Sequence, residues 1–146
     1  MNSIFDIAGQ GMTAQSVRLN TVASNLANAQ SAASSVDQVY RARHPLFAAV
    51  QKDAMDAQAG WSDAPDAGEE GMGVQVLGVV ESQAPLERRY EPGHPLADKD
   101  GYVLYPNVNV VEEMADMISA SRSFQINVEM LQSAKTMAQR LLSLGQ

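Results

Sequence analysis

Two long segments, one at each end of the chain, repeat apolar residues every three or four positions, and no other feature constrains the fold as strongly. Within residues 3–29 the steps alternate between three and four, and only Gln15 interrupts the apolar pattern. The same alternation of steps runs through residues 110–144. Such spacing is typical of an α-helix with one apolar seam. The expected seams consist of Phe5, Ala8, Met12, Gln15, Leu19, Val22, Leu26 and Ala29, and of Val110, Met114, Met117, Ser121, Phe124, Val128, Leu131, Lys135, Ala138 and Leu142.

The two seams indicate that the terminal helices pair as a helical hairpin or coiled coil, although a plain two-helix core inside one domain has the same periodicity. In the second segment Glu112, Glu113 and Asp116 lie in the first turns, and Lys135 and Arg140 lie near the end. This order of charges suits the helix macrodipole. A helix over this segment is about 50 Å long at about 1.5 Å per residue, which is more than a small globule needs.

The polar face of the first expected helix is almost free of charge. Asp6 and Arg18 are its only charged residues, and amides and hydroxyls fill the other polar positions. A helix that faces bulk water usually carries Lys and Glu there, whereas neutral polar groups are cheaper to bury against a neighbour. We therefore expect other subunits to cover this face. Gly9 and Gly11 either allow a neighbouring backbone to approach closely or mark a frayed first turn.

Between the helical segments the apolar period changes to two. Residues 36–50 form one such run, which Pro45 restricts to an edge strand. A β-branched run follows at 74–82, and residues 87–90 and 102–105 are two further strand candidates separated by turn signals. The expected fold class is therefore α+β and mainly α, in which long N- and C-terminal helices pair as a coiled-coil-like hairpin and the middle segment is small and β-rich.

The negative charge of the chain is concentrated in one stretch. The formal net charge is −7, and residues 53–70 contain six acids and no base, so the rest of the chain is close to neutral. That stretch is too rich in Ala, Gly and acid to bury much apolar surface, and we expect a mobile acidic loop at 51–72. The expected organisation is a terminal helical, coiled-coil domain from residues 1–30 and 110–146, and a β-rich middle region at 31–109 that contains this loop.

The composition offers no basis for a catalytic, cofactor-binding or metal site. The chain has no cysteine, which excludes disulfides, thiol nucleophiles and Cys-ligated zinc. His44 and His94 each precede a proline, and neither has a second histidine or a paired carboxylate at a useful spacing. With 10 Lys+Arg against 17 Asp+Glu there is no basic stripe for nucleic acid. No apolar run indicates a cleaved secretory signal or direct membrane insertion.

Several short motifs resemble those of the flagellar basal-body rod and hook proteins. The amino-terminal match is ASNLANA at 23–29, and the middle matches are YRA at 40–42 and YEPGHPLAD at 90–98. The later matches are YPNVNVVEEM at 105–114 and SASRSFQ at 119–125. The first motif resembles the wider rod and hook family, and the proline-rich middle together with the ending resembles its proximal rod subtype. Phe124 departs from the tyrosine that the family commonly has.

This resemblance implies a structural, non-enzymatic subunit of the bacterial flagellar basal-body rod. Similar proteins are exported unfolded by the flagellar type III apparatus without a cleaved signal peptide. They polymerise helically with other proximal and distal rod proteins into the periplasm-spanning shaft that transmits torque from the membrane ring to the hook. The implied partners also include the junction proteins of the membrane ring and export gate.

Two other classes of function stay open at this point. A soluble helical adaptor or export chaperone of a type III secretion system predicts a stably folded helical bundle in isolation. The rod interpretation predicts disordered termini in the free monomer, because lone helices with such faces are marginal. A small hydrolase would depend on His44 or His94.

The candidate functional residues are therefore those expected at subunit interfaces. Arg122 is included because its neighbours are small and uncharged, and Asn107 is included although Asn107 or Asn109 can equally cap the helix that follows. The full set is Phe5, Met12, Leu19, Asn20, Val22, Ser24, Asn25, Leu26, Asn28, Tyr105, Asn107, Met114, Arg122, Phe124, Asn127, Val128, Leu131 and Leu142.

Overall fold

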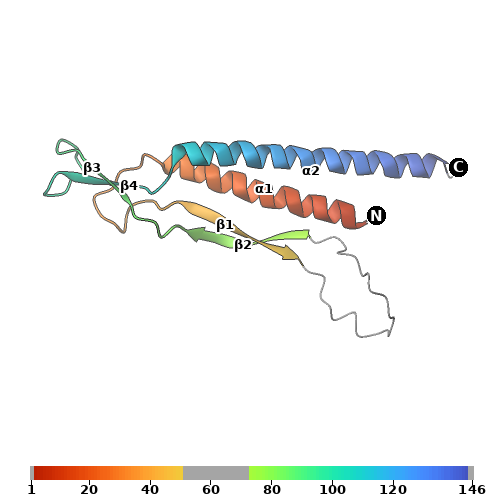
Figure 1. Ribbon diagram of the computed structural model, residues 1–146, viewed down its shortest axis with the longest axis horizontal. Coiled ribbons are helices and arrows are strands. Elements are labelled where there is room, and N and C mark those ends of the chain that lie inside the picture. Colours follow the sequence, from red (N-terminus) through yellow and green to blue (C-terminus); the bar gives the residue numbers. More distant parts are fainter. Residues whose placement is uncertain (1, 51–72, 145–146) are drawn as a thin grey trace, which may run out of the picture.

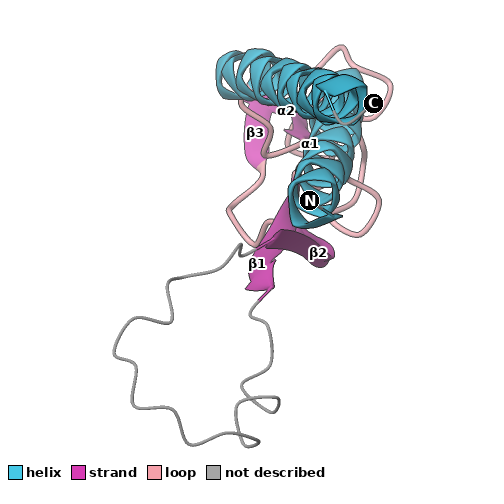
Figure 2. Ribbon diagram, turned by 90° about the vertical axis from the view of Figure 1, so that its right-hand side faces the viewer, coloured by secondary structure: helices cyan, strands magenta, loops and turns pink. Residues whose placement is uncertain are grey.

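The computed structural model describes residues 2–50 and 73–144, with side chains placed for 4–50 and 73–143, and its elements form three layers. Helix α1 (Asn2–Asn28) lies between helix α2 (Val110–Leu144) on one side and a hairpin of strands β1 (Arg43–Val50) and β2 (Gly73–Glu81) on the other (Figures 1 and 2). The helices are antiparallel, so the start of α1 and the end of α2 lie at one end of the molecule. A second hairpin, β3 (Glu87–Tyr90) and β4 (Tyr102–Tyr105), lies at the opposite end.

The predicted fold class is confirmed at this level: two terminal helices flank a small antiparallel β middle. The acidic stretch at 51–72 lies outside the described residues. Neither α1 nor α2 contains a segment that is both long and apolar enough to cross a membrane.

Helix α2 begins at an asparagine cap. The Asn109 Oδ1 atom accepts hydrogen bonds from the backbone N–H of Val111 at 3.1 Å and of Glu112 at 3.5 Å. These bonds satisfy N–H groups that have no partner inside the first turn, and Glu112 and Glu113 lie in that turn. Of the two cap candidates, Asn109 therefore caps the helix, and Asn107 is free for another role.

The seam expected on α1 contributes to the core. Ala8, Val22 and Ala29 are buried, and Phe5, Met12, Leu19 and Leu26 are partly buried. The core is built mainly from small side chains: Ala14 is 2% exposed on α1 and Ala120 is fully buried on α2.

The seam expected on α2 is correct in part. Six of its ten residues are partly buried: Met117, Ser121, Phe124, Val128, Leu131 and Ala138. The other four are exposed: Val110, Met114, Lys135 and Leu142. The most deeply buried positions of α2 lie in a row that the seam left out, through Glu113, Ala120, Asn127 and Ala134. α1 approaches this row closely at Gly11, where an added Cβ would lie 2.8 Å from Asn127 Nδ2.

That close contact also decides between the two interpretations of the helical glycines. Gly11 permits close approach to α2, whereas a Cβ at Gly9 would meet nothing within 4 Å. Both glycines lie inside α1 rather than in a frayed segment before it.

Strands β1 and β2 pair antiparallel, from Arg43 opposite Glu81 to Val50 opposite Gly73, with one irregularity between Leu46 and Phe47. Pro45 thus lies on an edge strand as expected, since both strands of a two-stranded sheet are edges. The expected strand at 36–50 was too long, because only 43–50 is a strand. Directly before β1, the Ala42 carbonyl accepts from the Ser82 N–H at 2.7 Å, and the Ala42 N–H bonds a side chain, as described below.

Strands β3 and β4 pair antiparallel, from Glu87 opposite Tyr105 to Tyr90 opposite Tyr102, at the positions that the sequence predicted. The turn before β4 uses Gly101 at φ +81°, a conformation that favours glycine. Ala33, in the segment after α1, exchanges backbone hydrogen bonds with Leu104 of β4 at 3.0 and 3.4 Å. This hairpin is thereby tied to the end of α1.

Candidate functional site

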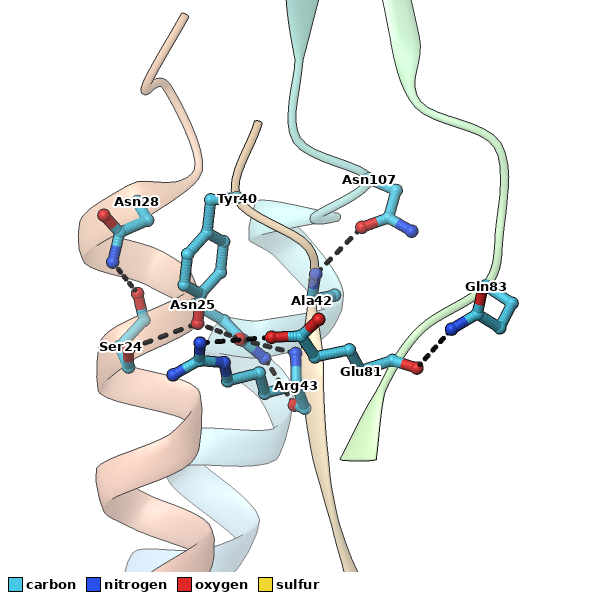
Figure 3. Close-up of polar contacts among 9 residues, drawn as sticks. All are labelled: Ser24, Asn25, Asn28, Tyr40, Ala42, Arg43, Glu81, Gln83 and Asn107. Carbon is cyan, nitrogen blue, oxygen red and sulfur yellow. Dashed lines mark hydrogen bonds and ion pairs between the residues drawn. The ribbon is translucent and has the colours of Figure 1, made fainter. Parts of the chain in front are cut away.

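The most densely connected polar cluster lies where α1, the start of β1 and the start of α2 meet. We call it the asparagine junction, and it consists of Ser24, Asn25, Tyr40, Arg43 and Glu113, with Asn107 beside it. Figure 3 shows most of these side chains converging on the strand backbone at residues 42–43. Among the predicted interface residues, the structure brings Ser24, Asn25 and Asn107 together here.

Asn25 is fully buried and uses both its donors and both its acceptor positions. Its Nδ2 donates to the Arg43 carbonyl at 2.8 Å and to Glu113 Oε1 at 2.9 Å. Its Oδ1 accepts from the Arg43 N–H at 2.9 Å and from the Tyr40 hydroxyl at 2.8 Å. One side chain of α1 therefore binds the backbone of β1 in the manner of a neighbouring strand, and it also binds α2.

Two neighbouring groups hold this arrangement in place. The Tyr40 hydroxyl lies 3.2 Å from the Ser24 hydroxyl, and the Arg43 guanidinium stacks over the Tyr40 ring at 5.4 Å from its centroid. Arg43 also pairs with Glu81 of β2 at 3.1 Å, although both side chains are about half exposed. An exposed pair of this kind adds little stability, so the buried hydrogen bonds carry the junction.

Asn107 binds the same strand segment from the other side. Its Oδ1 accepts from the Ala42 N–H at 2.8 Å, and its Nδ2 donates to the Ala84 carbonyl at 2.9 Å. Two asparagines thus satisfy consecutive N–H groups, of Ala42 and Arg43, at the point where β1 begins.

Glu113 is the charged member of the junction and is only 6% exposed. Burial raises the pKa of its carboxyl group, while the Asn25 hydrogen bond and the nearby His44 act in the opposite direction. None of the ion pairs among the described residues involves Glu113. The Glu113 carboxylate is therefore buried, and its hydrogen-bond partner is the neutral side-chain amide of Asn25.

Two further contacts fix α2 against α1. Arg18 pairs with Asp116 at 2.6 Å, one helical turn beyond Glu113, and Gly11 lies against Asn127. The junction, the ion pair and the glycine contact follow one another along the two helices.

The predicted interface residues divide by burial into three groups. Within the chain Val22, Asn25 and Tyr105 are already buried, and the Tyr105 hydroxyl donates to Glu91 at 3.1 Å. Four are exposed: Asn20, Met114, Arg122 and Leu142. The partly buried residues are Phe5, Met12, Leu19, Ser24, Leu26, Asn28, Asn107, Phe124, Asn127, Val128 and Leu131. A contact with another subunit stays a prediction for all of them.

Tyr40, Arg43 and Glu113 were missed as members of this site. Nothing in helical periodicity connects them to Asn25, because all three lie outside α1 and far from Asn25 along the chain. The YRA motif at 40–42 was the one sequence signal that pointed to Tyr40.

Comparison with known proteins finds matches at both ends of the chain. The family profile described as "Flagella basal body rod protein" matches residues 5–30, and "Flagellar basal body rod FlgEFG protein C-terminal" matches residues 99–144. A relative from Salmonella typhimurium, named flagellar basal-body rod protein FlgC, is 50% identical over 99% of this chain and 97% of its own length. The chain belongs to the flagellar basal-body rod protein family.

More distant relatives carry the same name. The proteins from Yersinia enterocolitica and Borreliella burgdorferi are 44% and 36% identical, again over 99% of this chain and 97% of their own length. The two profile matches of the rod family cover α1 and the region from before β4 through α2, so they include Asn25, Asn107 and Glu113 of the asparagine junction.

Proposed function

We propose that this protein is a structural, non-enzymatic subunit of the proximal rod in the bacterial flagellar basal body. The observation that carries the proposal is the 50% identity to a flagellar basal-body rod protein over almost the whole of both chains. In this role it polymerises with other rod proteins into the periplasm-spanning shaft that transmits torque. The proposed partners are other proximal and distal rod subunits and the junction proteins of the membrane ring and export gate. We propose that this subunit reaches them by type III export without a cleaved signal.

We further propose that α1 and α2 pair in coiled-coil fashion as one terminal domain, with residues 31–109 as a second region. Two contacts support this pairing: Gly11 meets Asn127, and Asn25 meets Glu113. On each helix the two contact positions are two heptads apart, which is the repeat that a coiled coil requires. The inward-facing row of α2 keeps the same heptad interval through Glu113, Ala120 and Asn127.

The junction suits a subunit that bears load. It joins α1, α2 and β1 by buried hydrogen bonds, so the β1–β2 hairpin cannot turn relative to the helices without breaking them. Because each helix has a partner within the chain, we expect the free subunit to be ordered around the junction. Within α1 and α2, the fastest amide exchange is then expected at the helix ends distant from it.

A gene replacement tests the proposed function. A strain that lacks the gene receives either the full chain or residues 30–146, which omit α1, and immunoblotting confirms equal amounts of both proteins. We expect motility and intact basal bodies with the full chain and neither with the truncated one. Normal motility without α1, or purified basal bodies that lack the full chain by mass spectrometry, would refute the rod assignment. A protein that stays in the cytoplasm bound to an export substrate would instead indicate the chaperone alternative.

A further inference from the structure

The loop between β3 and β4, residues 91–101, is closed by hydrogen bonds of its own. It belongs to the hairpin at the end of the molecule opposite to the start of α1 and the end of α2 (Figure 1). At the base of the loop the Glu91 N–H donates to the Gly101 carbonyl at 2.9 Å. Within it the His94 N–H donates to the Glu91 carbonyl, and the Ala97 N–H donates to the His94 carbonyl, both at 3.0 Å. None of these backbone groups changes its charge with pH.

Two side chains of the loop add hydrogen bonds of a different kind, because each accepts from backbone N–H groups through an atom that can take up a proton. The Asp98 Oδ1 atom accepts from the Asp100 N–H at 2.9 Å and from the Tyr102 N–H at 2.8 Å. The His94 Nδ1 atom accepts from the Leu96 N–H at 3.1 Å. The loop is therefore fastened at two points, one by each side chain.

The two fastenings respond to different ranges of pH. A neutral imidazole has one ring nitrogen with a proton and one without, and only the bare nitrogen can accept a hydrogen bond. Protonation places a proton on both nitrogens, so the His94 ring then cannot accept from Leu96. Histidine is the side chain that ordinarily changes its charge between about pH 5 and 8, whereas a carboxylate ordinarily takes up a proton near about pH 4. Mild acid should thus break the bond to His94 and leave the bonds to Asp98 in place.

Within the described residues, the ring of His94 has no charged partner that would replace the lost bond. Asp98 pairs instead with Arg88 of β3 at 3.6 Å. The Glu91 carboxylate accepts from the Tyr105 hydroxyl of β4 at 3.1 Å. None of the ion pairs in residues 4–50 and 73–143 involves a histidine. A charged His94 therefore gains no ion pair that would hold the turn closed. The other ionisable groups of the two strands and the loop are Glu87, Arg89, Tyr90, Lys99, Asp100 and Tyr102.

We propose that His94 is a pH-sensitive fastening of the β3–β4 loop: its neutral ring holds residues 94–97 closed, and its protonated ring releases them. The release is local, because the base of the loop at Glu91 and Gly101 and the bonds to Asp98 persist. The shape of this end of the molecule thus follows the pH of its surroundings. The inference rests on the hydrogen bonds of the loop and not on the proposed function.

Hydrogen exchange of single amides in the full chain tests the proposal. Solvent-exchange NMR at about pH 7.5 and about pH 5.5 gives each rate, and division by the rate of an unstructured peptide at the same pH removes the direct effect of pH on exchange. The protection of the Leu96 amide should fall about fivefold or more at the lower pH, the size expected for one hydrogen bond. Its midpoint should coincide with that of the His94 ring signals. The amides of Asp100 and Tyr102, which Asp98 holds, should keep their protection and serve as internal controls. Equal protection of Leu96 at both pH values would overturn the proposal.

Three variants separate the His94 ring from other effects of acid. His94→Asn supplies an acceptor that does not titrate and that bonds the N–H two residues further on, as in an Asx-turn, so the protection of Leu96 should become independent of pH. His94→Ala should lower that protection at both pH values. His44→Asn removes the only other histidine of the chain and should leave the Leu96 profile unchanged. A pH response that persists in His94→Asn, or that disappears in His44→Asn, would show that a different group governs the loop and would reject the proposal.

Discussion

Replacing Asn25 by alanine is the sharpest test of the asparagine junction. The substitution removes four hydrogen bonds of 2.8 to 2.9 Å from a side chain with no exposed surface. It leaves the N–H and the carbonyl of Arg43, the Tyr40 hydroxyl and the Glu113 carboxylate without this partner. At about 1 kcal/mol of net stability for each hydrogen bond, the free energy of unfolding should fall by about 4 kcal/mol. That is a large part of the whole stability of a domain of this size.

The matched control is Asn20→Ala on the same helix. Asn20 is exposed and makes no side-chain hydrogen bond within the described part of the chain, so its loss should change stability by less than about 0.5 kcal/mol. Urea unfolding of both variants, followed by circular dichroism, gives the two free energies at an unchanged slope. A loss below about 1 kcal/mol for Asn25→Ala would mean that the junction does not hold the helices and β1 together.

Asn25→Asp separates the hydrogen bonds from simple packing, because it keeps the shape of the side chain. An ionised aspartate cannot donate to the Arg43 carbonyl or to Glu113, and it places a second negative charge beside Glu113. We expect this variant to be as unstable as Asn25→Ala at neutral pH. Part of its stability should return in acid, where protonation restores one donor. Identical stability of Asn25→Asp and the wild type at neutral pH would contradict this account.

Three other substitutions test separate parts of the structure. Folding raises the pKa of Glu113. Its contribution to stability is therefore complete at pH values below the pKa of the unfolded chain, and it is lost as the pH rises through the pKa of the folded protein. Glu113→Gln should raise the free energy of unfolding at neutral pH and flatten its pH dependence in urea titrations. Gly9→Ala should raise Tm through a gain of up to about 1 kcal/mol in helix propensity. Gly11→Ala should not raise Tm, because its Cβ would meet Asn127, and the double variant Gly11→Ala with Asn127→Ala should recover the gain. Gly101→Ala should lower thermal stability by about 1–2 kcal/mol, because φ is +81° and its Cβ would lie 2.9 Å from the Tyr90 ring; an unchanged Tm would refute that strain.

Local pattern was enough to predict most of the elements. The helices expected at 3–29 and 110–144 are Asn2–Asn28 and Val110–Leu144, and the strands at 87–90 and 102–105 are where the sequence predicted them. The α2 seam was wrong in part, because large apolar residues such as Met114 were assumed to face inward, whereas Ala120 and Glu113 are buried there.

The candidate site could be predicted only in part. On the neutral polar face of α1, Thr21 and Asn25 are buried within the chain, whereas Thr13 and Asn20 are exposed, and cover by other subunits stays a prediction. Asn25 was among the residues chosen. Its partners could not be predicted, because the segment that covers it is brought there by tertiary packing. Gln10 also lies against the backbone of this chain, at Gly73 of β2, so the chain's own strands cover part of the face that other subunits were expected to cover.

The chemistry of the junction explains why an asparagine occupies a buried position between seam residues. Where β1 begins, the N–H and carbonyl of Arg43 point at α1, and α1 cannot supply a strand to pair with them. A partner there must donate and accept at once, which excludes apolar residues and ionised acids; an amide does so from two separate atoms. The amide has a second donor and a second acceptor position, and Glu113 and Tyr40 occupy them. The residue that anchors the strand therefore also fixes the register of the two helices: a rotation of the hairpin breaks its bonds to Arg43, and a slip between the helices breaks its bond to Glu113.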